Sequence, residues 1–226
     1  MAKARSPWDA INRRLDLAIA GKRGRIRAEQ YNGGSPLRLD RVSAGKLSLP
    51  TGRIVVTDAY CATEYPPLSI LVAPGRYPID IVLAKFARRI DSARGAFLVV
   101  TFSSDKVVLW LPVTAVAAAD PCFTDESPNS FVQEGATGVF SAESAAIHFA
   151  GMKDPVKHAR RLGKHEHREG NCDWLNYRPA RGPENAILCR GGYGDGTYQC
   201  YAGHGPNARV ARLVIDFNVA QPTPDR

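Results

Sequence analysis

A glycine-rich segment, residues 191–196, holds the side chains of this 226-residue sequence that are best suited to chemistry. Glycines adopt the positive φ angles of tight turns, and the backbone N–H groups of such a turn can hold an anion. No Gly-Lys-Ser/Thr follows, so the segment is not a phosphate loop of the nucleotide-binding type. We expect a hairpin turn that either satisfies turn geometry alone or binds a ligand. The ligand-binding candidates here are Gly192, Tyr193, Gly194, Asp195, Gly196 and Tyr198.

An enzyme would also need an acid or a base held in a cleft, and two residues near the turn are candidates. In this hypothesis Asp195 and His204 line one pocket with the glycine turn and act on an anionic substrate. Asp58, Glu143 and Asp216 are further candidates, and each has a structural alternative at a strand end or in the first turn of a helix. No nucleophile motif of the Gly-x-Ser-x-Gly type occurs. The residues alone leave open whether the protein is an enzyme.

Neither a metal nor a cofactor is predicted. Histidines between residues 158 and 167, followed by Cys172, are zinc-ligand types, but their spacing matches no usual zinc pattern and the Lys and Arg around them repel a cation. The five cysteines include no Cys-x-x-Cys pair, which favours buried thiols. Cys189 and Cys200 flank the glycine turn and would face each other if the turn closed a hairpin in the right register.

Basic side chains concentrate in two segments, residues 1–27 and 153–169, within a chain of net charge +8. Such charge favours an anionic partner, such as nucleic acid, a lipid surface or an acidic protein. The candidate basic patch consists of Arg13, Arg14, Lys22, Arg23, Arg25, Arg27, Lys157, Arg160, Arg161 and Lys164. An aromatic and polar stretch, residues 171–179, offers a further binding surface around Trp174, whose alternative role is in the core.

One helix is expected near the start of the chain, where Ser6 and Pro7 form a helix-start pattern and apolar residues recur at helical spacing until Gly21. We expect its apolar stripe to dock on the main body; the alternative is a free stripe that waits for a partner. Residues 22–46 are basic and rich in Gly and Ser, which predicts a linker or an irregular covering segment.

Short apolar runs bounded by Pro, Gly, Asp and Asn dominate from Leu47 onward, as is typical of strands in a sandwich or barrel. Ser103–Lys106 lies between two such runs and predicts a hairpin turn. Helical pieces are expected from Ser141 to about Met152 and from Asp154 to Leu162. The expected strands are Arg53–Asp58, Leu68–Val72, Tyr77–Phe86, Ala96–Phe102, Val107–Leu111, Ala186–Arg190, Tyr198–Ala202 and Val210–Phe217.

These patterns predict a mainly β, sandwich-like fold with a few short helices, and an α+β fold is the alternative. We divide the chain into a basic N-terminal helix and linker (1–46), a β-rich domain (47–218) and a disordered tail (219–226). No run of about 18 apolar residues occurs, so no membrane span is expected and a cytoplasmic location is the default.

Five strings of residues, in this order and spacing, carry a family resemblance. They are Leu49–Val55 with Asp58, Pro74–Pro78, Gly138–Phe140, Gly192–Tyr198 and Asp216–Phe217. Over about residues 47–218 the chain resembles the bacterial family named domain of unknown function 4241. The resemblance implies a shared β-rich fold and brings no activity with it. The two basic segments lie outside these strings.

The preferred interpretation is a non-enzymatic binding or accessory protein of the bacterial cytoplasm that presents loops and basic segments to a protein partner. A toxin-neutralising immunity protein is one concrete version. Its basicity argues mildly against a nucleic-acid-degrading toxin as the target, because the surface of such a toxin is usually basic too. The alternatives are a small, hydrolase-like enzyme that acts on an anionic substrate, and a nucleic-acid-binding protein that uses residues 1–27 and 153–169.

Overall fold

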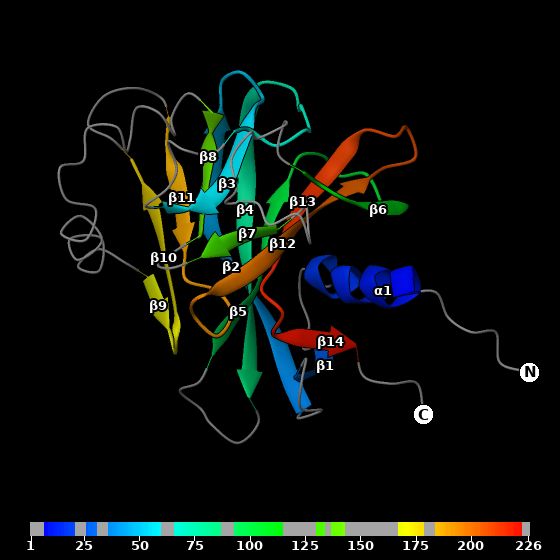
Figure 1. The fold of residues 1–226 in the computed structure, drawn as a ribbon, viewed down its shortest axis with the longest axis vertical. Helices are drawn as coiled ribbons and strands as arrows, with labels where there is room; N and C mark the ends of the chain where they lie inside the picture. Colours follow the sequence, from blue (N-terminus) through cyan, green and yellow to red (C-terminus); the bar gives the residue numbers. More distant parts are fainter. Residues whose placement is uncertain are drawn as a thin grey trace, which may run out of the picture.

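The computed structural model describes residues 7–20, 26–30, 36–59, 66–86, 93–114, 130–133, 137–142, 167–178 and 184–222. Within these ranges the chain forms one helix and fourteen strands (Figure 1). They are α1 (Pro7–Ile19), β1 (Ile26–Gln30), β2 (Pro36–Leu49), β3 (Ile54–Asp58), β4 (Gly75–Phe86), β5 (Arg94–Thr101), β6 (Leu109–Pro112), β7 (Ser130–Gln133), β8 (Thr137–Ser141), β9 (His167–Glu169), β10 (Cys172–Tyr177), β11 (Ala186–Cys189), β12 (Gly196–His204), β13 (Val210–Asp216) and β14 (Ala220–Pro222).

The strands form two antiparallel sheets, so the prediction of a mainly β fold is confirmed. The large sheet has nine strands in the order β14-β1-β2-β4-β5-β13-β12-β6, with β7 also beside β12. The small sheet has the order β3-β8-β11-β10-β9. One core cluster takes buried side chains from both sheets, among them Ile81 and Ile215 of the large sheet and Ile54 and Ile187 of the small one.

Helix α1 docks on the large sheet, as its apolar stripe predicted. Leu15 and Ala18 are fully buried, and the helix contacts β5, β6, β13 and β14 (Figure 1). At the C-terminal end of the helix the carbonyl of Ala18 accepts a hydrogen bond from Arg41, which satisfies one of the acceptors that a helix end leaves free. The indole N–H of Trp110 donates to Asp16 Oδ1 at 3.1 Å. The helix is therefore part of the main body.

The prediction of a linker over residues 22–46 is wrong for the residues of this range that the structure describes. Strand β1 lies there, and β2 runs without a break across the expected boundary between residues 46 and 47. Leu37 and Leu39 alternate with charged residues, as a half-buried strand requires, but a bulge at Gly45 with φ +98° interrupts the period of two. Strand β14 lies likewise in the expected tail, where its residues pair with β1.

Two other local predictions are wrong. Ser103–Lys106 does not close a hairpin, since β13 and β12 lie between β5 and β6 in the sheet. Residues 68–72 form single bridges instead of a strand. Ser141 ends β8, and the helical pieces expected over 143–152 and 154–162 lie outside the described residues. The other seven strands that we expected are present with ends shifted by a few residues.

A buried amide joins the two sheets. Asn185, at the start of the chain segment that leads into β11, accepts from the backbone N–H of Ser48 at 2.8 Å and donates to the carbonyl of Lys46 at 2.6 Å and to Asn176 Oδ1 at 2.7 Å. Gly45 lies beside this junction, and a Cβ there would come within 2.5 Å of Asn176 Nδ2. The bulge in β2 therefore makes room for the asparagine pair of the small sheet.

Replacing Asn185 with Ala should lower the free energy of unfolding by about 2 kcal/mol, because the buried Ser48 N–H and Asn176 Oδ1 lose their partner. Urea denaturation followed by circular dichroism measures this loss. Asn171→Ala is the matched control, since that side chain is exposed, and should change stability by less than about 0.5 kcal/mol. Equal losses in the two variants would contradict the role of Asn185.

Candidate functional site

The glycine-rich segment is a corner between the two sheets, which corrects the expected hairpin. It connects β11 of the small sheet to β12 of the large sheet, and these strands are not neighbours. Gly191 forms a parallel bridge with Gly95 and packs against Phe217, whose ring would lie 2.4 Å from a Cβ at residue 191. Glycine is therefore needed at Gly191 for close approach, a requirement that the sequence pattern could not separate from turn geometry.

Hydrogen bonds close the corner at the next two glycines, Gly192 and Gly194. The N–H of Gly192 donates to the carbonyl of Gly95 at 2.8 Å, so this N–H is not free to hold an anion. Gly192 has φ +63°, and a Cβ on it would lie 2.2 Å from the Tyr198 hydroxyl oxygen. The Tyr198 hydroxyl itself donates to the carbonyl of Gly194 at 2.7 Å. The corner is thus a hydrogen-bonded, closely packed unit.

The pKa of Tyr198 keeps this hydroxyl a donor. Burial of the ring raises the pKa above its usual value of 10.0, and the negative charge of Asp195 raises it further, while the backbone of Tyr193 and the charge of Arg94 act in the opposite direction. Tyr198 is therefore protonated at neutral pH, as its bond to Gly194 requires. It supports the corner and is not a phenolate base.

Tyr193 projects from this corner with 49% of its surface exposed. The guanidinium carbon of Arg94 lies 4.6 Å from the centre of the tyrosine ring, and Arg94 also donates to the carbonyl of Gly192 at 3.3 Å. The amide of Gln30 donates to the Tyr193 hydroxyl at 2.5 Å. We call these three residues, Tyr193, Arg94 and Gln30, the Tyr193 platform.

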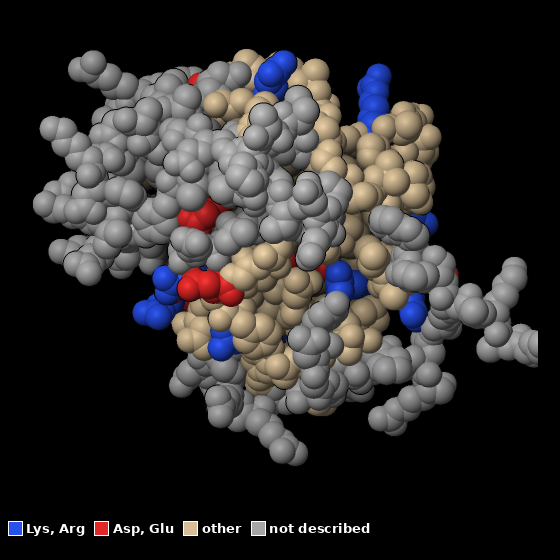
Figure 2. Space-filling model, in the orientation of Figure 1, with Lys and Arg blue, Asp and Glu red and all other residues tan. Residues whose placement is uncertain are grey.

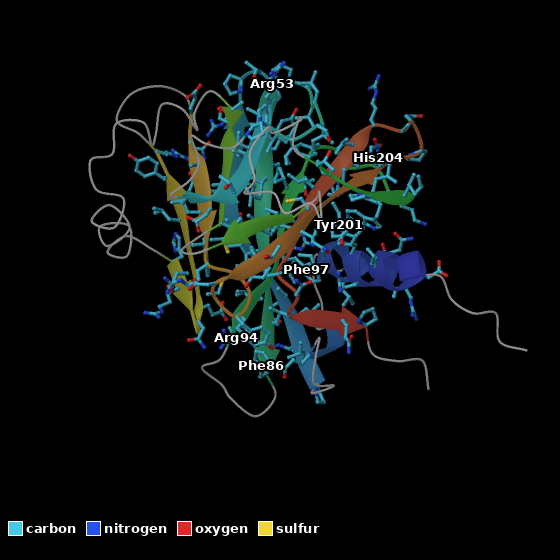
Figure 3. All side chains as sticks on the ribbon, in the orientation of Figure 1. Arg53, Phe86, Arg94, Phe97, Tyr201 and His204 are labelled. Carbon is cyan, nitrogen blue, oxygen red and sulfur yellow. The ribbon has the colours of Figure 1, made fainter. Side chains whose placement is uncertain are left out.

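The Tyr193 platform combines three distant parts of the chain, namely the corner, β5 and β1. Sequence reasoning found Tyr193 but missed Arg94 and Gln30. No local pattern marks either residue, because the contact depends on the corner reaching across to β5 and on β1 lying in the large sheet. In Figure 3 Arg94 is labelled at the lower end of the molecule.

Asp195 and His204 do not share a pocket. Asp195 is exposed and directly precedes β12, whereas His204 is the last residue of that strand. Nine steps along an extended strand span roughly 30 Å, and Figure 3 shows His204 far from Arg94. The imidazole Nδ1 of His204 lies 3.0 Å from the carbonyl of Ala208 in the turn that follows. The prediction of one pocket lined by Asp195, His204 and the glycine turn is therefore wrong.

Asp216 is bound to the N-terminal helix. Its carboxylate Oδ2 lies 2.6 Å from Nε of Arg14, and its Oδ1 accepts from the N–H of Asn218 at 2.9 Å. Phe97 and Gln199 lie opposite Asp216 in register, so their side chains share the sheet face that α1 covers. Burial raises the pKa of Asp216 above its usual range, although the Arg14 charge and the Asn218 hydrogen bond act against this rise.

Arg14 consequently does not belong to the expected basic patch, because its guanidinium is turned inward to Asp216. Arg13 lies on α1 and is partly buried. On the face drawn in Figure 2 the described Lys and Arg are spread singly over the surface. The other candidates, either whole or in their side chains, lie outside the described residues: Lys22, Arg23, Arg25, Arg27, Lys157, Arg160, Arg161 and Lys164.

Two further candidates have buried positions. Trp174 of β10 is 8% exposed and belongs to the main core cluster, and the exposed His167 ring stacks on it with the ring centres 5.7 Å apart. Asp58, at the end of β3, is buried opposite Thr137. Glu143 lies outside the described residues.

Within the described ranges, no three His, Cys, Asp or Glu side chains come together as a metal site requires. The same ranges contain no helix with the length and apolar character needed to cross a bilayer. Comparison with family models, curated proteins and solved structures gives no match to this chain.

Proposed function

We propose that this chain is a non-enzymatic binding protein of the bacterial cytoplasm that holds a protein partner through the Tyr193 platform. The observation that carries the proposal is an exposed tyrosine whose ring and hydroxyl are both held in place, by Arg94 and by Gln30. Tyrosine and arginine are enriched among the residues that dominate the energy of protein interfaces. An aromatic ring held in its binding position loses less entropy on association.

The positions of the catalytic candidates also favour binding over catalysis. Asp195 and His204 are separated by the length of β12, and Asp216 is paired with Arg14 inside the protein. An exposed Asp195 beside Tyr193 fits the rim of an interface better than a cleft. A toxin-neutralising immunity protein is the concrete form of this proposal, and the resemblance to the bacterial family named above is compatible with it.

Photo-crosslinking tests the proposal in the cells that naturally make the protein. A photoreactive phenylalanine analogue replaces Asp195, which leaves the Tyr193 platform intact, and a second protein carries the analogue at the exposed Asn207 as the matched control. We expect a discrete protein adduct from position 195 and none from position 207. Adding Tyr193→Ala should remove that adduct, and with the purified partner it should weaken binding about tenfold or more.

The other results would overturn the proposal. No adduct at position 195, the same adducts at both positions, or an adduct that Tyr193→Ala leaves unchanged would each exclude the platform as the binding site. An adduct with nucleic acid would instead support the nucleic-acid-binding alternative. Its affinity should then fall steeply with salt concentration.

A further inference from the structure

Two buried thiols lie against each other beneath the glycine-rich corner. The Sγ atoms of Cys172 and Cys189 are 3.9 Å apart, and each residue is at most 1% exposed. Cys189 lies opposite Trp174 in the β10–β11 pair, so Cys172 is its diagonal neighbour on the next strand. A hairpin at the glycine turn would have placed Cys200 opposite Cys189, but Cys200 lies in the large sheet opposite Ile215. The cysteine that sequence spacing overlooked is thus the one in contact.

We propose that Cys172 and Cys189 are a redox pair that a peroxide converts into a disulfide between β10 and β11. One thiol attacks the peroxide, which breaks the O–O bond and leaves a sulfenic acid and a first water molecule. The second thiol then attacks the sulfenic sulfur, so that the S–S bond forms and a second water leaves. The two sulfurs lose two electrons and two protons in total, and the hydrogen peroxide is reduced to two water molecules.

The surroundings of the pair suit this product. A disulfide is neutral, so it occupies a dry site without the cost of burying thiolate charge. The hydrogen bond with Cys172 and, second to it, burial raise the pKa of Cys189 well above its usual value, so the uncharged thiol is favoured there.

Bond formation needs the sulfurs to approach from 3.9 Å to about 2.05 Å. Diagonal neighbours in a sheet are farther apart than directly opposite residues, so some backbone movement must accompany the bond. Cys172 can supply it, because this residue begins β10 directly after the turn at Gly170 and Asn171. Strand β9, which pairs with β10 at this end, is only three residues long.

The same movement would reach the corner. A Cβ placed on Gly95 would lie 3.2 Å from both Cys172 Sγ and Gly191 Cα, so the thiol packs directly under the Gly95–Gly191 bridge. Drawing Cys172 Sγ toward Cys189 removes that support. The redox pair is thus placed to alter the packing of Gly191, next to the residues that hold Tyr193.

Peptide mapping of the purified full chain tests the pair. The Cys61→Ser/Cys122→Ser background removes the two cysteines outside the described residues. Trypsin cleaves after Arg181 and places Cys172 and Cys189 in separate peptides, whereas a disulfide keeps them joined. After treatment with hydrogen peroxide we expect a joined peptide pair whose mass is two hydrogen atoms less than the sum of the two reduced peptides. Dithiothreitol should separate the pair.

Three variants make the result specific. Cys172→Ser should abolish the joined peptides, Cys200→Ser should leave them unchanged, and Cys189→Ser should stop the reaction at a sulfenic acid on Cys172 that dimedone traps. A protein that stays folded by circular dichroism while peroxide gives only unlinked cysteines, or that links Cys200 instead, would overturn the proposal. If Cys172→Ser does not fold, the absence of a joined pair in the peroxide-treated wild-type protein would overturn it equally.

Discussion

Asp216→Asn should lower the free energy of unfolding by about 3–5 kcal/mol, the loss typical of removing one partner from a buried ion pair. The amide keeps the shape of the side chain and can still accept from the N–H of Asn218. What it removes is the charge that faces Arg14 at 2.6 Å. A guanidinium cannot give up its proton in a protein, so the variant must either bury the Arg14 cation without the opposite charge of Asp216 or release α1 from the sheet.

Arg14→Met should cost less, because the remaining carboxyl can take up a proton. The pKa of Asp216 is already raised by burial, and removing Arg14 raises it further. A carboxyl whose pKa is higher in the folded protein than in the unfolded chain contributes its full stability below the unfolded-state pKa of about 3.8. That stability is lost as the pH rises through the folded-state pKa. The destabilisation by Arg14→Met should therefore grow as pH rises through that range.

Urea titrations at several pH values measure both effects. The control is the double variant Arg14→Met/Asp216→Asn, which carries neither charge and should recover part of the stability that Asp216→Asn loses. Losses that simply add in the double variant would contradict a direct ion pair. So would an Arg14→Met effect that does not change with pH.

Gly191→Ala is the second change with a large expected effect. The new methyl group would lie 2.4 Å from the fully buried Phe217 ring, and the ring cannot move without disturbing Tyr198, which packs edge-on against it at 5.1 Å. We expect a loss of about 3 kcal/mol or more, at the upper end for overpacked cores. Thermal and urea unfolding of the purified variant measure this loss.

Gly196→Ala is the matched control from the same segment. Its nearest atom would be 3.6 Å away, an ordinary contact, and its φ is not in the left-handed region. Here the smaller freedom of the unfolded chain should raise stability by up to about 1 kcal/mol. A glycine-rich hairpin without close packing would predict similar effects at both positions, so equal effects would contradict the corner.

Composition and periodicity were sufficient for the mainly β class and for helix α1, since both depend on patterns local to each segment. Long-range pairing was not predictable in the same way. The runs on either side of Ser103–Lys106 look like a hairpin, but two later strands, β13 and β12, insert between them. Strand β2 was missed because its charged residues find partners far along the chain, as Arg41 does with Asp80 and Asp40 with Lys85.

At the candidate site, too, local features were predictable from the sequence and long-range contacts were not. Glycine spacing marked Gly191–Gly196 correctly as a special backbone segment. Its meaning depended on Gly95 and Phe217, which no local pattern connects to it. Likewise Arg14 looked like a surface charge until the position of Asp216 was known.

The pairing of β1 with β14 constrains when this protein can fold during synthesis. The amide of Gln221 donates to the carbonyl of Gln30, across 191 residues of chain. At the usual rate of translation a ribosome needs roughly 10–40 s to make that length. During this time α1 lacks the β13 carboxylate that pairs with Arg14, and β1 lacks one of its two neighbours. Helix α1 and strand β1 can therefore complete their contacts only after β13 and β14 have been synthesised.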